Sequence, residues 1–261
     1  MCYNVGMKVY GKNAVLETLR NENMTVLKLF LQANLHGKEF EEAFDLAKSR
    51  GIKVQFVEKK ILENELSEVN KQNNFGKAKP QEIHHQGMLA TVTDYQYATV
   101  ADILNAAKQK NEDEFILILN EVTDVHNFGN IIRTAECVGV HGIIISKDRN
   151  AQVNETVLKI SSGAAAHVKI ARVGNLAQTI EELKNQNIFV YGAEIGGKNV
   201  YSTNLKGKIA LIIGSEGEGI KQLIQKKCDE IVSIPQKGKI NSLNAGVAAG
   251  IVLFEAVRQR S

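Results

Sequence analysis

The 261-residue sequence is poor in cysteine, and its three cysteines stand far apart at positions 2, 137 and 228. No CxxC pair and no Cys/His cluster has metal-ligand spacing, so no metal site is predicted. Isolated thiols in an apolar-rich globular chain are typical of a reducing compartment. We expect Cys137 and Cys228 to occupy buried positions on helices.

Two kinds of hydrophobic segment are also missing. The N-terminal residues MCYNVGMKVYGKN lack the apolar core of a signal peptide. The longest apolar stretch, Leu243–Val257, contains Asn244 and Glu255 and is too short to span a bilayer. The sequence therefore predicts a soluble, cytoplasmic protein that does not act in a membrane.

Neither sign of charge dominates, because the formal net charge is +3 and the pI is near 8.6. This balance permits an RNA partner without requiring one, since nucleic-acid affinity depends on a local basic surface. The best local candidate is Lys71–Gln86, which combines three Lys, two His and Phe75. A solvated loop would have the same composition, so charge alone does not decide between the two interpretations.

The length and the 44% hydrophobic content predict two domains. Residues 1–93 alternate short helical and strand patterns and predict a small α/β unit. Residues 94–113 are polar and predict a linker, helical at first and then charged. From residue 114 to 261, short Ile- and Val-rich runs alternate with helical patterns, which predicts a parallel sheet covered on both faces.

The usual nucleotide-binding signatures are absent as well. The sequence contains no GxGxxG after a first strand and no GxxxxGK followed by Ser or Thr. Residues Gly214–Gly219 read GSEGEG, where three glycines let the backbone approach a ligand closely. The two carboxylates would repel a triphosphate, whereas a cationic or sugar-hydroxyl ligand suits them. S-adenosylmethionine has both properties.

Three segments carry the strongest signal: Asn120–Ala135, Leu211–Ile220 and Ile234–Leu253. Each joins an apolar strand-like run to a turn rich in Gly, Asn or Ser, and ligands of such sheets bind beyond the carboxyl ends of the strands. In this order they resemble the three signature motifs of the SpoU (TrmH-type) 2′-O-ribose RNA methyltransferases. The matching residues are Asn127, Gly129 and Arg133 in the first motif, Gly214, Glu216 and Gly217 in the second, and Ile234, Pro235, Ser242, Leu243 and Asn244 in the third.

The resemblance implies a fold that sequence rules would not predict. The catalytic half is expected to be a parallel-sheet α/β domain of the SPOUT superfamily with a trefoil knot, preceded by a small α/β/α RNA-binding domain. Family members are homodimers. The segments Val9–Arg20, His85–Gly87, Lys147–Ala165 and Phe254–Arg260 look like the bacterial subgroup that methylates a guanosine ribose in 23S ribosomal RNA.

The resemblance also assigns roles to single residues. S-adenosylmethionine would lie against Gly192, Ala193, Gly214, Gly217, Ile234 and Leu243, and the catalytic group would comprise Asn127, Arg133, Glu216, Ser242 and Asn244. Because a guanidinium stays protonated, Arg133 is expected to fix the target phosphate and lower the pKa of the ribose hydroxyl by its charge. His126 is the alternative base, and Ser242 would equally serve as the N-cap of the last helix.

Other functions remain open at this point. Within the family, the substrate could be a transfer RNA or an adenosine of ribosomal RNA. A non-catalytic RNA-binding factor for ribosome assembly could use the same fold. The helix predicted over Leu243–Arg258 is apolar almost all the way round, so we expect it to be buried on all sides and to lie close to a two-fold dimer partner.

Overall fold

The computed structural model describes residues 6–21, 24–67, 69, 83–239 and 242–261. The chain divides into two compact units. Met1–Gln96 and Val153–His167 form the first unit, and Tyr97–Gln152 and Val168–Ser261 form the second. The first unit therefore takes up a segment from the middle of the sequence. Most of the predicted basic segment Lys71–Gln86 lies outside the described residues.

The first unit contains a four-stranded mixed sheet with the strand order β1-β4-β2-β3. Strand β4 pairs antiparallel with both β1 and β2, and β2 pairs parallel with β3. Strand β1 was not predicted, because its four residues MKVY make a run too short to recognise. The strands are β1 (Met7–Tyr10), β2 (Val26–Gln32), β3 (Lys53–Val57) and β4 (Met88–Val92).

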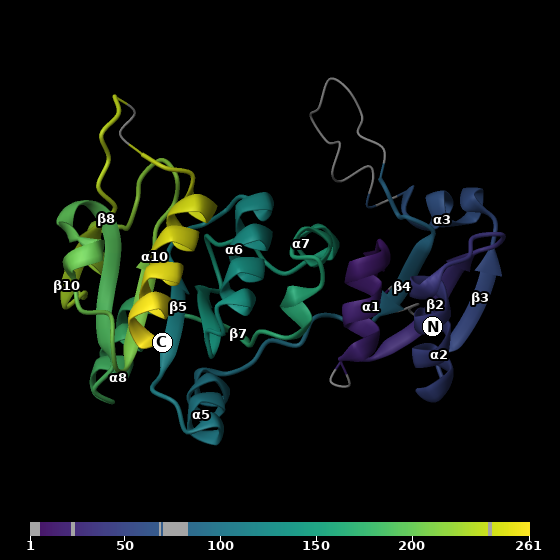
Figure 1. Ribbon diagram of the computed structural model, residues 1–261, viewed down its shortest axis with the longest axis horizontal. Helices are drawn as coiled ribbons and strands as arrows, with labels where there is room; N and C mark the ends of the chain where they lie inside the picture. The colour runs from purple at the N-terminus through teal and green to yellow at the C-terminus, as the bar shows by residue number, and fades with distance from the viewer. Residues whose placement is uncertain (1–5, 22–23, 68, 70–82, 240–241) are drawn as a thin grey trace. The chain divides into compact units, whose positions relative to one another are not determined.

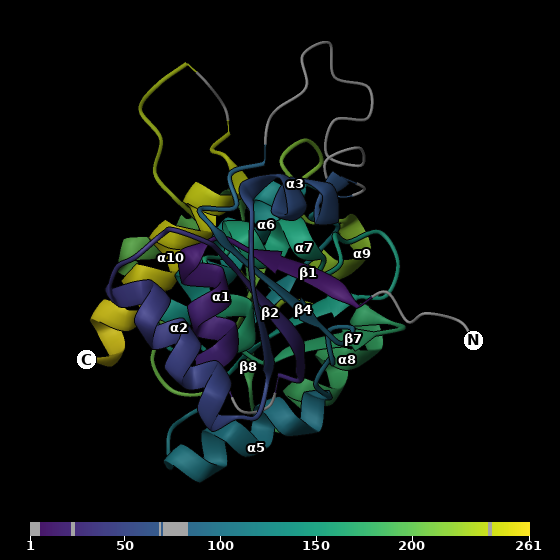
Figure 2. The same cartoon turned by 90° about the vertical axis from the view of Figure 1, so that its right-hand side faces the viewer.

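Helices cover this small sheet as their apolar periodicity predicts. The helices are α1 (Lys12–Arg20), α2 (Lys38–Ser49) and α3 (Lys59–Glu65). Figure 2 shows α1 and α2 side by side across the strands. Leu62 of α3 packs with Phe30 and Leu89 in the hydrophobic core of this unit. Helix α2 buries Phe40, Ala43 and Ala47 and ends before Gly51, whose φ of +66° is accessible to glycine at low cost.

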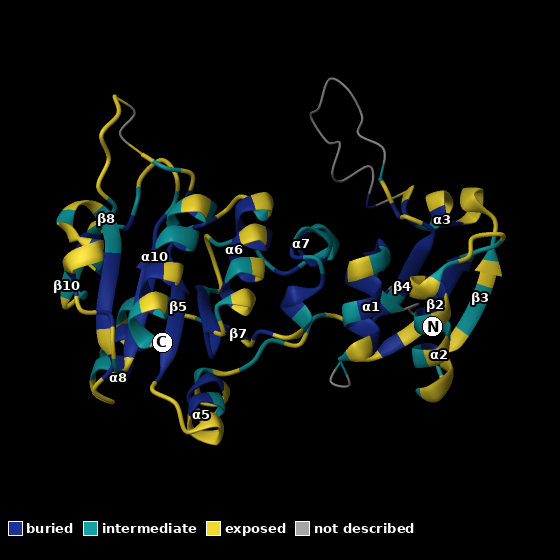
Figure 3. Cartoon of the chain, viewed as in Figure 1, coloured by how far each residue is buried: buried dark blue, intermediate teal, exposed yellow. Residues whose placement is uncertain are grey.

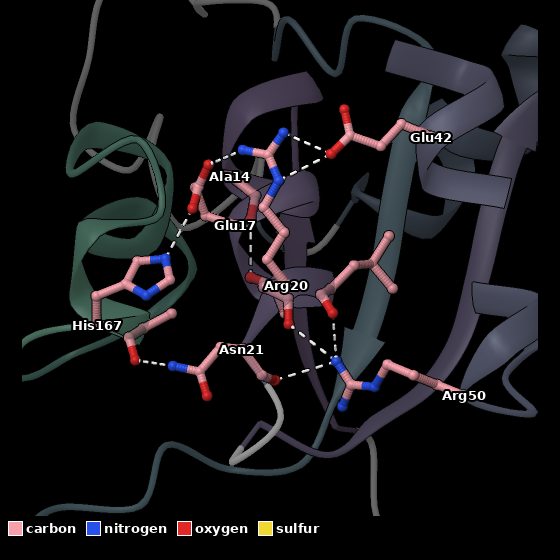
Figure 4. A network of polar contacts seen from close by, with 10 residues as sticks. Ala14, Glu17, Arg20, Asn21, Glu42, Arg50 and His167 are labelled. Carbon is pink, nitrogen blue, oxygen red and sulfur yellow. Dashed lines mark hydrogen bonds and ion pairs between the residues drawn. The ribbon is translucent and has the colours of Figure 1, made fainter. Parts of the chain in front are cut away.

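The middle segment of the chain packs against α1. It contains the helix α7 (Glu155–Ile160) and the short 3-10 helix η1 (Ala164–Ala166). Figure 4 shows the polar contacts: His167 Nε2 lies 2.7 Å from Glu17 Oε2, and the Asn21 side chain donates to the Ala166 carbonyl. At Gly163, φ is +90° and an added Cβ would come within 2.4 Å of Glu17 Cβ. A glycine is required there for both reasons.

The second unit contains a six-stranded sheet in the order β10-β8-β9-β5-β6-β7, and every neighbouring pair is parallel. The predicted parallel sheet is confirmed. Figure 3 shows the central strands buried, as their continuous runs of Ile, Leu and Val require. The strands are β5 (Phe115–Leu119), β6 (Gly142–Ser146), β7 (Ile170–Val173), β8 (Phe189–Asn199), β9 (Ile209–Ile213) and β10 (Glu230–Ser233).

Helices lie on both faces of this sheet (Figure 1). Helices α5, α8 and α9 share one hydrophobic core with the strands, while α6 and α10 pack against each other and α10 contacts β9. Helix α5 lies in the segment predicted as a linker, and Thr99 and Asp102 form a capping box at its start. The elements are α5 (Val100–Lys110), α6 (Val125–Cys137), α8 (Leu176–Lys184), η2 (Val200–Ser202), α9 (Gln222–Gln225) and α10 (Ala245–Arg260).

Three local predictions are wrong. Cys137 is exposed at the end of α6, and Cys228 is half-buried outside any helix, so neither is buried helix filler. Helix α10 is not buried on all sides, because Val247 and Phe254 are 51% and 56% exposed. Among the residues that the structure describes, no helix is long and apolar enough to cross a membrane.

Candidate cofactor and catalytic site

The three sequence motifs meet at one edge of the large sheet. Strands β10, β8, β9 and β5 are consecutive neighbours in that sheet and run parallel. Their carboxyl ends therefore lie side by side. The first motif follows β5, the second follows β9, and the third follows β10. This edge collects loops that are more than a hundred residues apart in the sequence.

A cavity of about 350 Å³ lies at these strand ends, and we call it the cofactor cavity. Five of the six residues expected to hold the cofactor line it: Ala193, Gly214, Gly217, Ile234 and Leu243. Gly192 is buried one position earlier in β8 and is not among the lining residues. The remaining described lining residues are Glu194, Ile195, Ile213, Ser215, Glu216, Glu218, Gly219, Val232, Ser233, Gln236, Ser242, Ala245 and Ala248.

The wall of the cofactor cavity is a tight turn after β9. The backbone N–H of Ser215 donates to the carbonyl of Gly219 at 3.1 Å, and the N–H of Gly219 donates back at 3.0 Å. A Cβ at Gly214 would lie 2.1 Å from the carbonyl carbon of Gly219. Only a residue without a side chain lets the two ends of the turn approach this closely. The glycine at position 214 is therefore needed for the turn that forms this wall.

Asn244 connects all three motifs. Its side-chain nitrogen donates to Asn127 Oδ1 at 2.8 Å and also to Glu216 Oε1. Its side-chain oxygen accepts from the N–H groups of Gly246 and Val247 at 3.0 and 3.2 Å, which makes it the N-cap of α10. Asn244, and not Ser242, therefore caps this helix. One amide thus orders the first turn of α10 and the polar groups of the other two motifs.

A second cavity of about 480 Å³ shares part of the same wall. We call it the polar cavity, because it is lined by Asp124, Asn127 and Arg149 together with residues of the GSEGEG turn. Ser215–Glu218 and Ala245 line both cavities. Two small molecules or groups placed in the two cavities would face each other across one turn of chain. That arrangement suits transfer of a group between them.

Arg133 and His126 stand apart from the lining residues. Both lie on α6 and are exposed, and neither is among the described residues lining the two cavities. Asn127, in the first turn of the same helix, is buried, and its N–H is capped by Asp124 Oδ1 at 2.8 Å. The first motif therefore places its amide inside the site and its arginine on the exposed side of α6.

The described lining residues of the cofactor cavity include three carboxylates, Glu194, Glu216 and Glu218, and no basic side chain. Such a wall favours a cationic ligand over a phosphate. Among the residues that the structure describes, no group of His, Cys, Asp and Glu could hold a metal ion. Burial raises the pKa of the Cys228 thiol, which lies behind Gly192, to about 11, so this cysteine is not a reactive nucleophile.

Sequence reasoning did not find Glu194, Asp124 or Arg149. Glu194 is a carboxylate just beyond the part of β8 that pairs with β9, so its place after a run of buried residues was the available signal. Asp124 precedes α6 by one residue, which is a recognisable capping pattern. Arg149 follows β6 in a turn with a φ of +61°, and nothing in the local sequence relates it to the other motifs.

Two cavities that share one turn at the strand ends of a parallel sheet are the arrangement expected of an α/β group-transfer enzyme. The family model described as SpoU rRNA methylase matches residues 114–254, and the model described as RNA 2′-O ribose methyltransferase substrate binding matches residues 8–83. The chain belongs to the SpoU rRNA methylase family.

Relatives of similar length support this membership. The chain is 41% identical over 255 residues to YacO of Bacillus subtilis, assigned to the TrmH family of tRNA/rRNA methyltransferases, covering 97% of this chain and 96% of that protein. It is 36% identical over 257 residues to RlmB of Escherichia coli, a 23S rRNA (guanosine-2′-O-)-methyltransferase. The match covers 97% of this chain and 98% of that protein.

Solved structures show the same fold. The methyltransferase AviRb of Streptomyces viridochromogenes, in complex with S-adenosylmethionine, matches with a TM-score of 0.75 and 23% identity over 98% of this chain and 90% of that one. An rRNA methyltransferase of Sinorhizobium meliloti, also bound to S-adenosylmethionine, matches with a TM-score of 0.73 and 22% identity over 97% and 87%.

The expectations drawn from the three motifs are therefore confirmed at the level of the family. The second unit has the SPOUT fold, and an N-terminal substrate-binding domain precedes it. The protein is an S-adenosylmethionine-dependent RNA 2′-O-methyltransferase. The trefoil knot and the roles of the single site residues stay predictions.

Proposed function

We propose that this enzyme transfers a methyl group from S-adenosylmethionine to the 2′-hydroxyl of a guanosine ribose in 23S ribosomal RNA. The contact of Asn244 with both Asn127 and Glu216 carries the proposal, because it joins the three motifs at the wall between the two cavities. The likeness to RlmB of Escherichia coli over nearly the whole of both chains supports the choice of nucleotide.

The cofactor cavity is suited to S-adenosylmethionine. Its glycine-shaped turn brings backbone groups close to a ligand, and its carboxylates match a sulfonium cation. Backbone groups of Gly214, Ile234 and Leu243 would hold the adenine and the ribose, with Ala193 and Gly217 closing the sides. When bound, S-adenosylmethionine supplies a methyl group that its positive sulfur has already activated.

The chain's own task is to place the ribose hydroxyl and to help its proton leave. Asn127 and Glu216 line the polar cavity. The Asn127 amide can donate a hydrogen bond to a ribose, and the Glu216 carboxylate can accept one from a ribose hydroxyl. Their shared partner Asn244 holds both groups in one orientation. Ser242 lines the cofactor cavity and offers a further hydroxyl to the same wall. Orientation of two bound groups across a short gap accounts for much of the barrier lowering in such reactions.

Arg133 acts on the RNA from the exposed side of α6. A guanidinium cation fixes a phosphate of the target nucleotide and stabilises the developing oxyanion by its charge. The exposure of the side chain supports this role, because a long RNA substrate must reach it from the solvent. His126 is exposed about two turns earlier on the same helix and remains the alternative base.

The N-terminal domain, residues 1–93, captures the RNA. Residues 8–83 match a substrate-binding family, which supports the division into an RNA-binding domain over 1–93, a connection over 94–113 and a methyltransferase domain over 114–261. The enzyme is a homodimer that acts in the cytoplasm, where ribosomal RNA is found in bacteria such as those of the curated relatives.

Ribose-methylation mapping of total RNA tests the substrate. A strain lacking this gene is compared with its parent, and one guanosine of 23S RNA is expected to lose its 2′-O-methyl group. Re-expression of the intact protein restores the mark, and the Arg133→Ala variant does not. Loss of a mark on a transfer RNA would instead favour the second candidate, which the tRNA/rRNA assignment of YacO motivates.

A further inference from the structure

Glu194 is a carboxylate of the cofactor cavity that lies outside all three sequence motifs. Pairing of β8 with β9 ends at Ala193 and Ile213, so Glu194 is the first residue beyond the paired edge. Its side chain is half-buried and lines the cavity. A carboxylate in this position is close to any ligand of a cavity of about 350 Å³.

Backbone amides hold both oxygens of this carboxylate in place. Glu194 Oε2 accepts from the N–H of Ile220 at 2.8 Å, and Oε1 accepts from the N–H of Ile195 at 3.0 Å. The first bond anchors the end of the GSEGEG turn. Neither oxygen forms an ion pair with a Lys or Arg in the described part of the chain, whereas Glu218 is paired with Lys221. The two backbone N–H groups therefore fix the orientation of the Glu194 carboxylate at the cavity wall.

Cofactor and product differ in charge at a single atom. Transfer of the methyl group to the ribose oxygen breaks the carbon–sulfur bond, and its electron pair stays on sulfur. The sulfonium of S-adenosylmethionine becomes the neutral thioether of S-adenosylhomocysteine, and the hydroxyl proton leaves to solvent or a base. A fixed carboxylate stabilises the cation much more than the thioether, and the difference is larger where water is partly excluded.

We propose that Glu194 is a specificity-determining residue that makes the cofactor cavity prefer S-adenosylmethionine over S-adenosylhomocysteine. The inference rests on the proposed function, which assigns S-adenosylmethionine to this cavity. Its consequence is that methyl transfer removes the charge that Glu194 attracts, so the product leaves more readily than the cofactor.

The Glu194→Gln variant tests this charge effect, because the amide oxygen of glutamine can still accept the N–H of Ile220. Isothermal titration of the full chain measures the dissociation constants for S-adenosylmethionine, for S-adenosylhomocysteine and for an analogue with a protonated amine in place of the sulfonium. We expect the two cations to bind about tenfold more weakly to the variant, with S-adenosylhomocysteine changed less than about twofold. Added salt should reduce the difference.

The matched control is Glu230→Gln, which removes a carboxylate from β10 outside the lining of the cavity. It should leave all three dissociation constants unchanged. An equal loss of affinity for cations and thioether in Glu194→Gln would mean that Glu194 only anchors the turn, and unchanged constants would mean that it has no role. Either result overturns the inference. If the wild-type protein binds none of the three ligands, the proposed function fails together with it.

Discussion

At the scale of single residues, Asn244 combines a structural contact with contacts to two other motifs of the site. It caps α10 and donates to two polar groups from distant motifs. We expect Asn244→Ala to lose about 1 kcal/mol of stability through the missing cap. Methyl transfer should fall by at least about tenfold, because Asn127 and Glu216 lose their common partner. Denaturant unfolding and single-turnover methylation measure the two effects.

The control for Asn244 is a second asparagine cap on a helix away from the site. Asn175 accepts from the N–H of Gln178 at 3.1 Å at the start of α8. Asn175→Ala should cost a similar free energy of unfolding and retain methyl transfer. If both variants lost activity in proportion to stability, the contacts of Asn244 with the other motifs would be irrelevant to catalysis.

Substitution of the single residue Arg133 tests whether it acts on the RNA and not on the cofactor. Arg133→Ala should abolish methyl transfer, with a loss of at least about 100-fold, while the dissociation constant for S-adenosylmethionine changes less than about twofold. Arg133→Lys should fail too, because a point charge does not reproduce the planar donor fork. Calorimetry and a methylation assay provide the readouts.

The control is Arg172→Ala, which removes an arginine from the edge strand β7 and should leave activity intact. A parallel loss of cofactor affinity in Arg133→Ala would refute the assignment to RNA.

A buried histidine gives the protein a predictable response to acid. The side chain of His141 is 1% exposed, its Nδ1 accepts from the N–H of Phe115 at 3.0 Å, and its Nε2 lies 3.1 Å from Glu112 Oε2. Burial lowers the pKa of His141, and Glu112 opposes this only in part. Because the folded pKa lies below the unfolded value of about 6.5, the stabilising contribution of the neutral ring is complete above that pH. It is lost as the pH falls through that value toward the folded pKa.

Thermal unfolding between about pH 7.5 and about pH 5.5 checks this effect. The midpoint of the wild-type protein should fall over this interval, and the fall should be smaller in His141→Gln. The exposed His126 provides the matched control, since His126→Gln should retain the wild-type dependence. An identical fall in the wild-type protein and His141→Gln would assign the acid response to other groups.

At the scale of elements, the connection between β6 and β7 is the least expected feature. These strands are adjacent and parallel, and their connection contains α7 and η1, which pack in the first unit against α1 and β1. The Tyr95 hydroxyl donates to the Ala165 carbonyl at 3.1 Å, and His167 contacts Glu17. The segment Val153–His167 therefore depends on residues at the start of the chain for its packing.

Removal of residues 1–93 should leave a protein that binds S-adenosylmethionine and has lost most of its RNA affinity. The segment Val153–His167 should then exchange its amide hydrogens faster, because Val157 and Leu158 lose part of their cover. Calorimetry, RNA-binding titration and hydrogen exchange measure the three effects. Full activity of the truncated protein on its RNA would show that residues 1–93 are not the substrate reader. Unchanged exchange in Val153–His167 would contradict the packing argument.

At the scale of the whole molecule, α10 offers a surface for a second copy of the chain. Val247 and Phe254 are exposed, and Gly250 and Ile251 between them are half-buried. The spacing of three, four and seven residues puts all four on one face of the helix. An apolar stripe of this kind is typical of a surface that is covered in an assembly, and two-fold dimers are the commonest closed assembly.

The full chain should therefore be a dimer, and so should residues 94–261. The double change Val247→Glu and Phe254→Glu should yield a monomer that still binds S-adenosylmethionine, because charges on the stripe disfavour its burial. Light scattering at micromolar concentration measures the mass. Leu223→Glu, at a residue that is 63% exposed on α9, is the control and should remain dimeric. A monomeric wild-type protein that binds the cofactor would refute the dimer.

The sequence by itself determined the large sheet and the position of the motifs in it. Runs such as Phe115–Leu119 and Ile209–Ile213 are apolar at every position, and only a strand covered on both faces needs that pattern. The order of the three motifs predicted the family. Local capping and glycine signals fixed most helix ends, although α6 begins at Val125, four residues before the predicted start at Gly129.

Only the tertiary structure decided which groups meet. Asn127, Glu216 and Asn244 contact one another because β5, β9 and β10 end at the same edge, and no local pattern encodes strand order. The same holds for Glu194, whose partner Ile220 lies in the loop after the neighbouring strand β9. It holds as well for Val153–His167, which packs against α1 and β1 from the start of the chain. Hydrophobic periodicity indicates which side chains of a helix or strand are buried. The pairing of distant strands and loops depends on the free energy of the whole packed chain.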